Sequence, residues 1–207
     1  MDPLATIESY KLKCAEEGSS RKRRQKQSEL TERAQLAHRT GNYEAALDLF
    51  CHLLAMVETD PSTTAVSEMR ATMTANIASA MHFLDHENVH FRDLAKDFYE
   101  RALDEFGKVE VGWITWMYYG NLTTKRMEYI RSRLDALSRG ERPDPSVYQD
   151  GTGKTRHWTR EEMEGTDRSW SFFSPYSWLY GGYQPTGTHV VHVESHTRES
   201  HEPGAAA

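Results

Sequence analysis

The stretch of residues 33–61, RAQLAHRTGNYEAALDLFCHLLAMVETDP, constrains the fold more than any other part of the chain. Gly41-Asn42 interrupts a helical pattern where a residue that tolerates positive φ is needed, and Asp60-Pro61 ends the second half. Apolar residues of the second half recur every three or four positions, which places them on one helical face. These residues are Tyr43, Ala46, Phe50, Leu53, Leu54 and Val57. The stretch therefore predicts two antiparallel helices joined by a tight turn.

The same helical spacing predicts further helices on both sides of this stretch. A second pair carries Val66, Met73, Ile77, Ala80 and Leu84, followed by Phe91, Ala95, Phe98, Ala102 and Phe106. A third pair carries Trp113, Trp116 and Met117 on a short helix, and Met127, Ile130, Leu134 and Leu137 on a longer one. Upstream, Asp2-Pro3 is a favourable helix start. We expect Leu4, Ile7, Lys11 and Cys14 to line one side of that first helix, which ends at Gly18.

The first hairpin resembles a tetratricopeptide unit, in which small residues let two helices approach and aromatic residues fill the gap to the next hairpin. Ala95, Tyr99 and Ala102 in the second pair resemble the positions that Ala46, Phe50 and Leu53 occupy in the first. The turn at residues 85–90 is longer than the family's turn and lacks its glycine. The resemblance covers residues 27–106 and extends weakly over residues 107–139.

Proteins of this family are typically non-catalytic, so the resemblance implies a concave face that binds an extended segment or a helix of a partner. One subset of the family binds the acidic tail of chaperones through Lys and Asn at fixed positions of the first helices. The matching positions here are Thr31 and Gln35, so we do not expect that specificity. A plain helical bundle without a groove remains the alternative.

The expected fold class is therefore all-α, with about three antiparallel helical hairpins and an irregular, aromatic-rich C-terminal arm. A chain of 207 residues is long enough for one domain with appendages. We divide it into an N-terminal helix and basic linker (residues 1–26), a helical domain (27–139), the arm (140–187) and a loose polar tail (188–207). The arm begins where closely spaced prolines, Pro143 and Pro145, and scattered glycines replace the helical period.

Charge and cysteine content limit the partners and the cellular compartment that we expect for this protein. With 25 Lys and Arg against 31 Asp and Glu, the net charge of -6 makes a nucleic-acid partner unlikely. Cys14 and Cys51 are too few for a disulfide framework, and no apolar run approaches the roughly 18 residues of a membrane span. The acidic, amphipathic start is unlike a signal peptide. We expect an intracellular, cytoplasmic protein, with cytoskeletal association as a further option and no membrane partner.

The basic run of residues 21–26, RKRRQK, leaves two interpretations open. It is either a solvated linker or the first turns of a long helix that continues into Leu30 and Ala34. Its function is either that of a solvated, charged helix face or that of a contact site. Such a site would be a nuclear localisation signal, a phosphate contact or a binding site for an acidic polymer such as a microtubule.

Three motifs contain residue types that are used in catalysis or in phosphate or metal binding, but none predicts a catalytic, cofactor or metal site. GTGKT at residues 151–155 resembles the end of a phosphate-binding loop, but position 148 is Tyr148 instead of glycine and no strand is expected before it. His189, His192, His196 and His201 are close in sequence, but no cysteine accompanies them and residues 190–193 favour extended chain. Asp85, His86 and Glu87 lie in a polar turn without a walled site.

The function we expect is that of a non-catalytic adaptor that binds a protein partner, with no small-molecule substrate and no cofactor. The predicted groove residues are Gln35, His38, Arg70 and Asn76. The predicted anchors of the arm are Trp170, Phe172, Phe173, Tyr176, Trp178 and Tyr180. These aromatic residues either fold back along the helices or bind another protein, where Trp and Tyr dominate interface energies. The alternative function is that of a small structural subunit in a large cytoskeletal or axonemal assembly. RNA binding is a third class.

Overall fold

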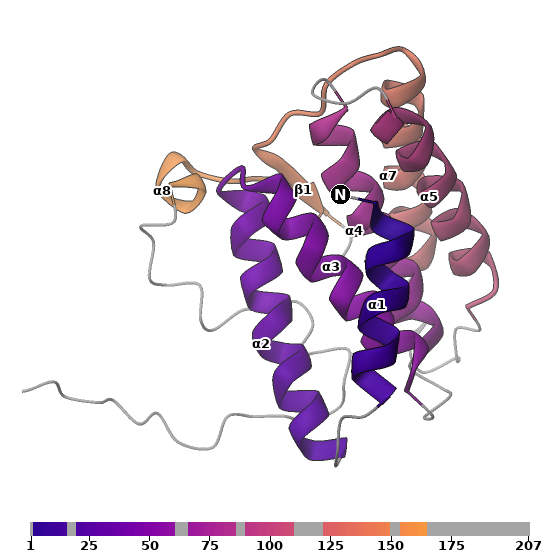
Figure 1. Ribbon diagram of the computed structural model, residues 1–207. Coiled ribbons are helices and arrows are strands. Elements are labelled where there is room, and N and C mark those ends of the chain that lie inside the picture. Colours follow the sequence, from indigo (N-terminus) through magenta and orange to yellow (C-terminus); the bar gives the residue numbers. More distant parts are fainter. Residues whose placement is uncertain are drawn as a thin grey trace, which may run out of the picture.

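The computed structural model describes residues 2–15, 20–60, 66–85, 90–109, 122–149 and 154–164. The helices are α1 (Pro3–Ala15), α2 (Ser20–Arg39), α3 (Tyr43–Glu58), α4 (Val66–Leu84), α5 (His90–Gly107), α7 (Leu122–Ser138) and α8 (Arg160–Met163). The strands are β1 (Val147–Gln149) and β2 (Thr155–His157). Packed helical hairpins dominate the described part of the chain (Figure 1), so the predicted all-α class is confirmed.

The first hairpin, α2 and α3, follows the sequence pattern closely. Gly41 adopts the predicted positive φ, at 80°, and the side chain of Asn42 caps α3 by accepting a hydrogen bond from the backbone N–H of Ala45. The six apolar residues that defined the predicted face of α3 are all buried: Tyr43, Ala46, Phe50, Leu53, Leu54 and Val57. The local turn and the apolar period therefore specify this hairpin together.

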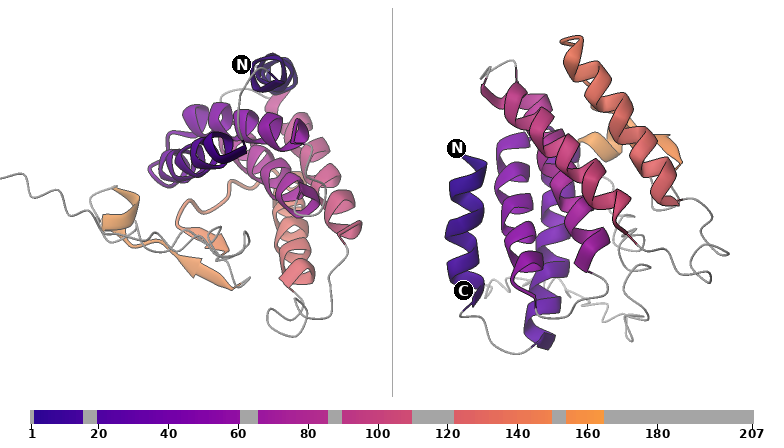
Figure 2. Two further views of the ribbon diagram at one scale, coloured as in Figure 1. Left: turned by 90° about the horizontal axis from the view of Figure 1, so that it is seen from below. Right: turned by 90° about the vertical axis from the view of Figure 1, so that its right-hand side faces the viewer.

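The remaining helices continue the stack in chain order. Helix α3 packs against α4, α4 packs against α5, and α5 packs against α7 (Figure 2). The predicted core residues of α5 are buried, namely Phe91, Ala95, Phe98, Ala102 and Phe106. Helix α7 is the longer helix of the predicted third pair, while Trp113, Trp116 and Met117 lie outside the described residues. Among the described helices, none combines the length and the apolar character that crossing a membrane requires.

Helix α1 packs on α3 and covers the first hairpin from outside (Figure 2). It starts as predicted, since a carboxylate oxygen of Asp2 accepts a hydrogen bond from the backbone N–H of Leu4 at 3.0 Å. Ile7 and Cys14 are buried against the core. Leu4, on the same predicted side of the helix, is 51% exposed.

The basic run is part of a helix, because α2 begins at Ser20 and continues without a break to Arg39. The linker interpretation is therefore wrong for these residues. Arg23 donates hydrogen bonds to the backbone carbonyl of Met56 and to the hydroxyl of Thr59, both at the end of α3. These contacts hold the start of α2 against the last turn of the neighbouring helix.

A small antiparallel sheet occupies the region expected to be irregular. β1 and β2 pair with the register Val147↔His157, Tyr148↔Arg156 and Gln149↔Thr155. The prediction that no strand precedes the GTGKT sequence is therefore wrong. A strand precedes it, but a second strand follows it where a phosphate-binding loop requires a helix. The sheet lies on the opposite side of the helical stack from α1 (Figure 2).

Candidate partner-binding face

We use the term inner face for the side of the stack that is formed by α2, α4 and α7. The chain returns across this face after α7, along residues 141–149 and 154–158, which include both strands (Figure 2). The contacts described next all join a helix of the stack to this returning segment. They give the inner face a set of hydrogen bonds and aromatic contacts to a segment outside the helical stack.

Side chains of the stack bind main-chain carbonyl groups of the returning segment. The Nε2 atom of His82 on α4 lies 2.9 Å from the carbonyl oxygen of Glu141. Arg133 on α7 donates from Nη2 to the carbonyl oxygen of Val147 at 3.0 Å. The hydroxyl of Tyr129, which accepts two hydrogen bonds from Arg133, lies 3.5 Å from the same carbonyl oxygen. Such contacts are made to the main chain and do not depend on the side chains of the bound segment.

An aromatic residue anchors the far end of the returning segment. Trp158 stacks on Tyr148 with ring centroids 3.7 Å apart, and the guanidinium of Arg39 lies 5.3 Å from the centroid of the Trp158 ring. Arg39 is the last residue of α2 and is 7% exposed. A guanidinium over an indole ring is a favourable cation–π arrangement, stronger when it is shielded from water. This contact fastens the segment to α2.

Beneath the inner face lies a cluster of rings from three helices. The imidazole of His38 on α2 contacts the rings of Tyr43, Phe50 and Phe83 at centroid distances of 5.3, 6.3 and 5.4 Å. Its Nε2 atom lies 3.2 Å from the hydroxyl of Ser79 on α4. Burial, together with the charge of Arg133, lowers the pKa of His38 to about 4. His38 is therefore neutral near pH 7 and belongs to the packing between α2 and α4.

Of the four predicted groove residues, Gln35 and Asn76 are half-buried and lie beside the inner face by their helical position. Gln35 lies one turn before Arg39, and Asn76 lies one turn before Ser79. The structure places the other two elsewhere. His38 points into the ring cluster, as described above. That any of these residues binds a partner stays a prediction.

Arg70 lies toward α5 instead of the inner face. Its Nε atom is 3.4 Å from a carboxylate oxygen of Glu105, which also accepts hydrogen bonds from Thr74 and Arg101. Glu58 on α3 bridges Arg101 and Lys11 and so joins α1 to the same network. Polar residues fasten four helices together here, which is a structural role.

The predicted aromatic anchors of the arm lie outside the described residues, as do the clustered histidines and Gly151 to Gly153. The arm residues concerned are Trp170, Phe172, Phe173, Tyr176, Trp178 and Tyr180. No group of three or more His, Cys, Asp or Glu residues within the described ranges could hold a metal ion.

Sequence reasoning missed the residues that build the inner face, namely Arg39, His82, Tyr129, Arg133 and Trp158. One signal was present for Arg133. It lies between Ile130 and Leu137 on the apolar side of α7, where a charged residue is unusual. Nothing in the sequence connected the other residues, since their partners are far away along the chain.

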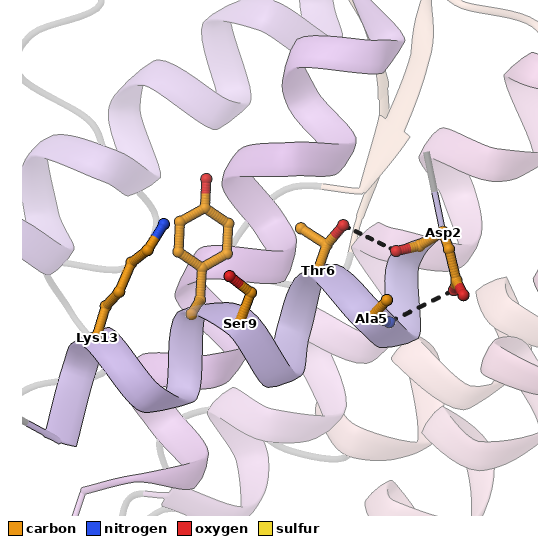
Figure 3. A pocket seen from close by; sticks show the side chains of 6 residues that line it. Asp2, Ala5, Thr6, Ser9 and Lys13 are labelled. Carbon is orange, nitrogen blue, oxygen red and sulfur yellow. Dashed lines mark hydrogen bonds between the residues drawn. The ribbon is translucent and has the colours of Figure 1, made fainter.

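A shallow hollow lies on the surface of α1. It is lined by Asp2, Ala5, Thr6, Ser9, Tyr10 and Lys13 (Figure 3). All six belong to α1 and its cap, so this helix supplies one wall and no second element closes the hollow. The hydroxyl of Tyr10 instead binds the carboxylate of Asp48 on α3, at 3.0 and 3.1 Å. The arrangement fits helix packing and contains no enclosed site.

Searches with the sequence and with the structure found no matching family model, no matching curated protein and no matching solved structure.

Proposed function

We propose that this protein is a non-catalytic adaptor of tetratricopeptide-like architecture, and that its inner face binds an extended segment of a partner protein. One observation carries the proposal. The helices already bind main-chain carbonyl groups of a non-helical segment of their own chain there, at Glu141 and Val147. The donors of this surface bind peptide carbonyl groups, and a guanidinium beside them contacts an aromatic ring. Both kinds of contact are used in peptide recognition.

The partner segment would lie beside the returning segment, over the middle of α2 and α4. Gln35 and Asn76 offer amide donors and acceptors at this position, and neither has a described contact that would occupy it. Amide side chains suit this role because they pair with a peptide backbone in either direction. The returning segment would then form one wall of the binding site.

Site-specific photo-crosslinking in cells tests this placement. A photoreactive phenylalanine analogue is introduced at Gln35, at Asn76 or, as the matched control, at Lys96, which is exposed on α5. We expect the first two positions to capture the same protein and Lys96 not to capture it. Far-UV circular dichroism checks that each labelled chain is folded. Equal capture at all three positions, or none at Gln35 and Asn76, contradicts the proposal.

The second candidate is the small structural subunit of a large assembly. Two exposed leucines on α1 favour it, since Leu4 is 51% and Leu12 is 75% exposed. Large apolar side chains on an outer helix are suited to burial against a neighbouring subunit. Sedimentation of the purified chain separates the two functions, because an adaptor should be monodisperse and a lattice subunit should associate. A subunit role further predicts that Leu12→Gln abolishes that association.

A further inference from the structure

Arg133 is a buried cation whose described hydrogen-bond partners are all neutral. Its residue is 9% exposed, and its guanidinium donates to the hydroxyl of Tyr129 and the carbonyl oxygen of Val147. Within the described part of the chain it forms no ion pair, and its Nη1 atom has no hydrogen-bond partner. A buried charge costs free energy unless an opposite charge compensates it. Among the described residues, Nη1 is therefore the group of Arg133 that stays available for a further acceptor.

Three carboxylates that follow α4 or α7 in the chain are already engaged by other groups. Arg92 binds Asp85 at 3.1 Å, and Arg139 binds Glu141 with hydrogen bonds of 2.7 and 2.8 Å. Asp144 accepts hydrogen bonds from the backbone N–H and the hydroxyl of Ser146. These hydrogen bonds, and also the charge of Arg133, help to lower the pKa of Asp144, but none of the three carboxylates forms an ion pair with Arg133 among the described residues. A second guanidinium, that of Arg39, is also buried on this face.

We infer that the Arg133 end of the inner face binds an acidic segment of the partner protein, with a Glu or Asp carboxylate facing the Arg133 guanidinium. A peptide is favoured over a free anion because the neighbouring donors bind peptide carbonyl groups, at Glu141 and Val147. The Nη1 atom of Arg133 still carries two N–H groups, and a hydrogen bond from a charged donor to a carboxylate is stronger than one to a neutral acceptor. The inference rests on the proposed function and names the chemistry of its partner. Arg133, the residue proposed to bind the carboxylate, lies on α7, whereas the tetratricopeptide subset that binds acidic tails uses the first helices of its hairpins.

The test uses the full chain and two fluorescein-labelled probes, an octaglutamate and an octaglutamine peptide, with binding measured by fluorescence anisotropy. We expect octaglutamate to bind at least about 10-fold more tightly than octaglutamine, with an affinity that falls as salt is added. Arg133→Met should weaken octaglutamate binding by about 10-fold or more, because a desolvated charge contributes more than an exposed one. The matched control is Arg131→Met, an exposed arginine of the same helix, which should stay within about 2-fold of the wild-type affinity.

Arg133→Lys keeps the test decisive if Arg133→Met does not fold, since it retains the charge and loses the planar fork. We expect it to bind octaglutamate with an intermediate affinity. Equal effects of the Arg133 and Arg131 substitutions, or no preference for octaglutamate, overturn the inference. Binding that appears only after Glu194, Glu199 and Glu202 are changed to Gln also overturns it, because the occupant is then this chain's own acidic end. If crosslinking at Gln35 and Asn76 succeeds while octaglutamate fails, the acidic chemistry is wrong and the adaptor function stands.

Discussion

Acidification should weaken the fold through His38, and the size of the effect follows from its surroundings. The imidazole lies among Tyr43, Phe50 and Phe83, and burial lowers its pKa from 6.5 to about 4. The unfolded chain therefore takes up a proton at a higher pH than the folded chain does. The contribution of neutral His38 to the free energy of unfolding is complete above pH 6.5 and is lost as the pH falls toward 4. From these two pKa values, the free energy of unfolding should decrease by about 2 kcal/mol between pH 7 and pH 5.

Urea unfolding at pH 7 and at pH 5 measures this contribution when wild type is compared with His38→Gln. Glutamine does not titrate and can still bind the hydroxyl of Ser79. Other titrating groups, including His82, whose pKa burial also lowers, change stability in both proteins alike. We therefore expect the loss of stability on acidification to be smaller in the variant by about 2 kcal/mol. The control is His157→Gln, because the side chain of His157 is exposed on β2. An equal loss in wild type and His38→Gln would refute the assignment of His38 to the packed interior.

Three further outcomes are expected from thermal or urea unfolding. Phe50→Ala should cost about 3–5 kcal/mol, because Phe50 is 3% exposed in the core, whereas Leu12→Ala should change stability by less than about 0.5 kcal/mol. Gly41→Ala should lower the free energy of unfolding by about 1 kcal/mol because of its φ of 80°, since no atom lies within 4 Å of the added methyl group. The control is Gly107→Ala, which is equally uncrowded but has no positive φ and should not destabilise the protein. Glu58→Gln should cost about 1–2 kcal/mol, and added salt should reduce the difference from wild type if the ion pairs with α1 and α5 are responsible.

The helices and their buried faces were predictable because the signals that specify them are local. A turn of α3 brings residues three and four positions apart onto one face, so the positions of Phe50, Leu53 and Leu54 could be read directly. Gly41 was equally readable, since positive φ selects a residue without a Cβ atom. Burial of these residues needs no knowledge of the rest of the chain.

The inner face was not predictable, because each of its contacts depends on residues that are distant in sequence. His38 is polar and was expected to be exposed, yet Phe83 from α4 encloses it. Arg70 was expected in the groove, but Glu105 on α5 attracts it to the other side of α4. The strands were missed because each has three residues, and β2 is exposed along its length without alternation. Their position is specified by contacts with α2 and α7.

The contact between Arg39 and Trp158 has a consequence for the order of assembly during synthesis. These residues are separated by about 120 positions, whereas neighbouring helices of the stack meet across short connections. A ribosome delivers the chain from its N-terminus, so α1 to α5 can associate while residue 158 is still to be made. Every nascent molecule thus passes through a stage with an uncovered inner face. A chaperone or an early-binding partner has access during that interval, before the covering segment arrives.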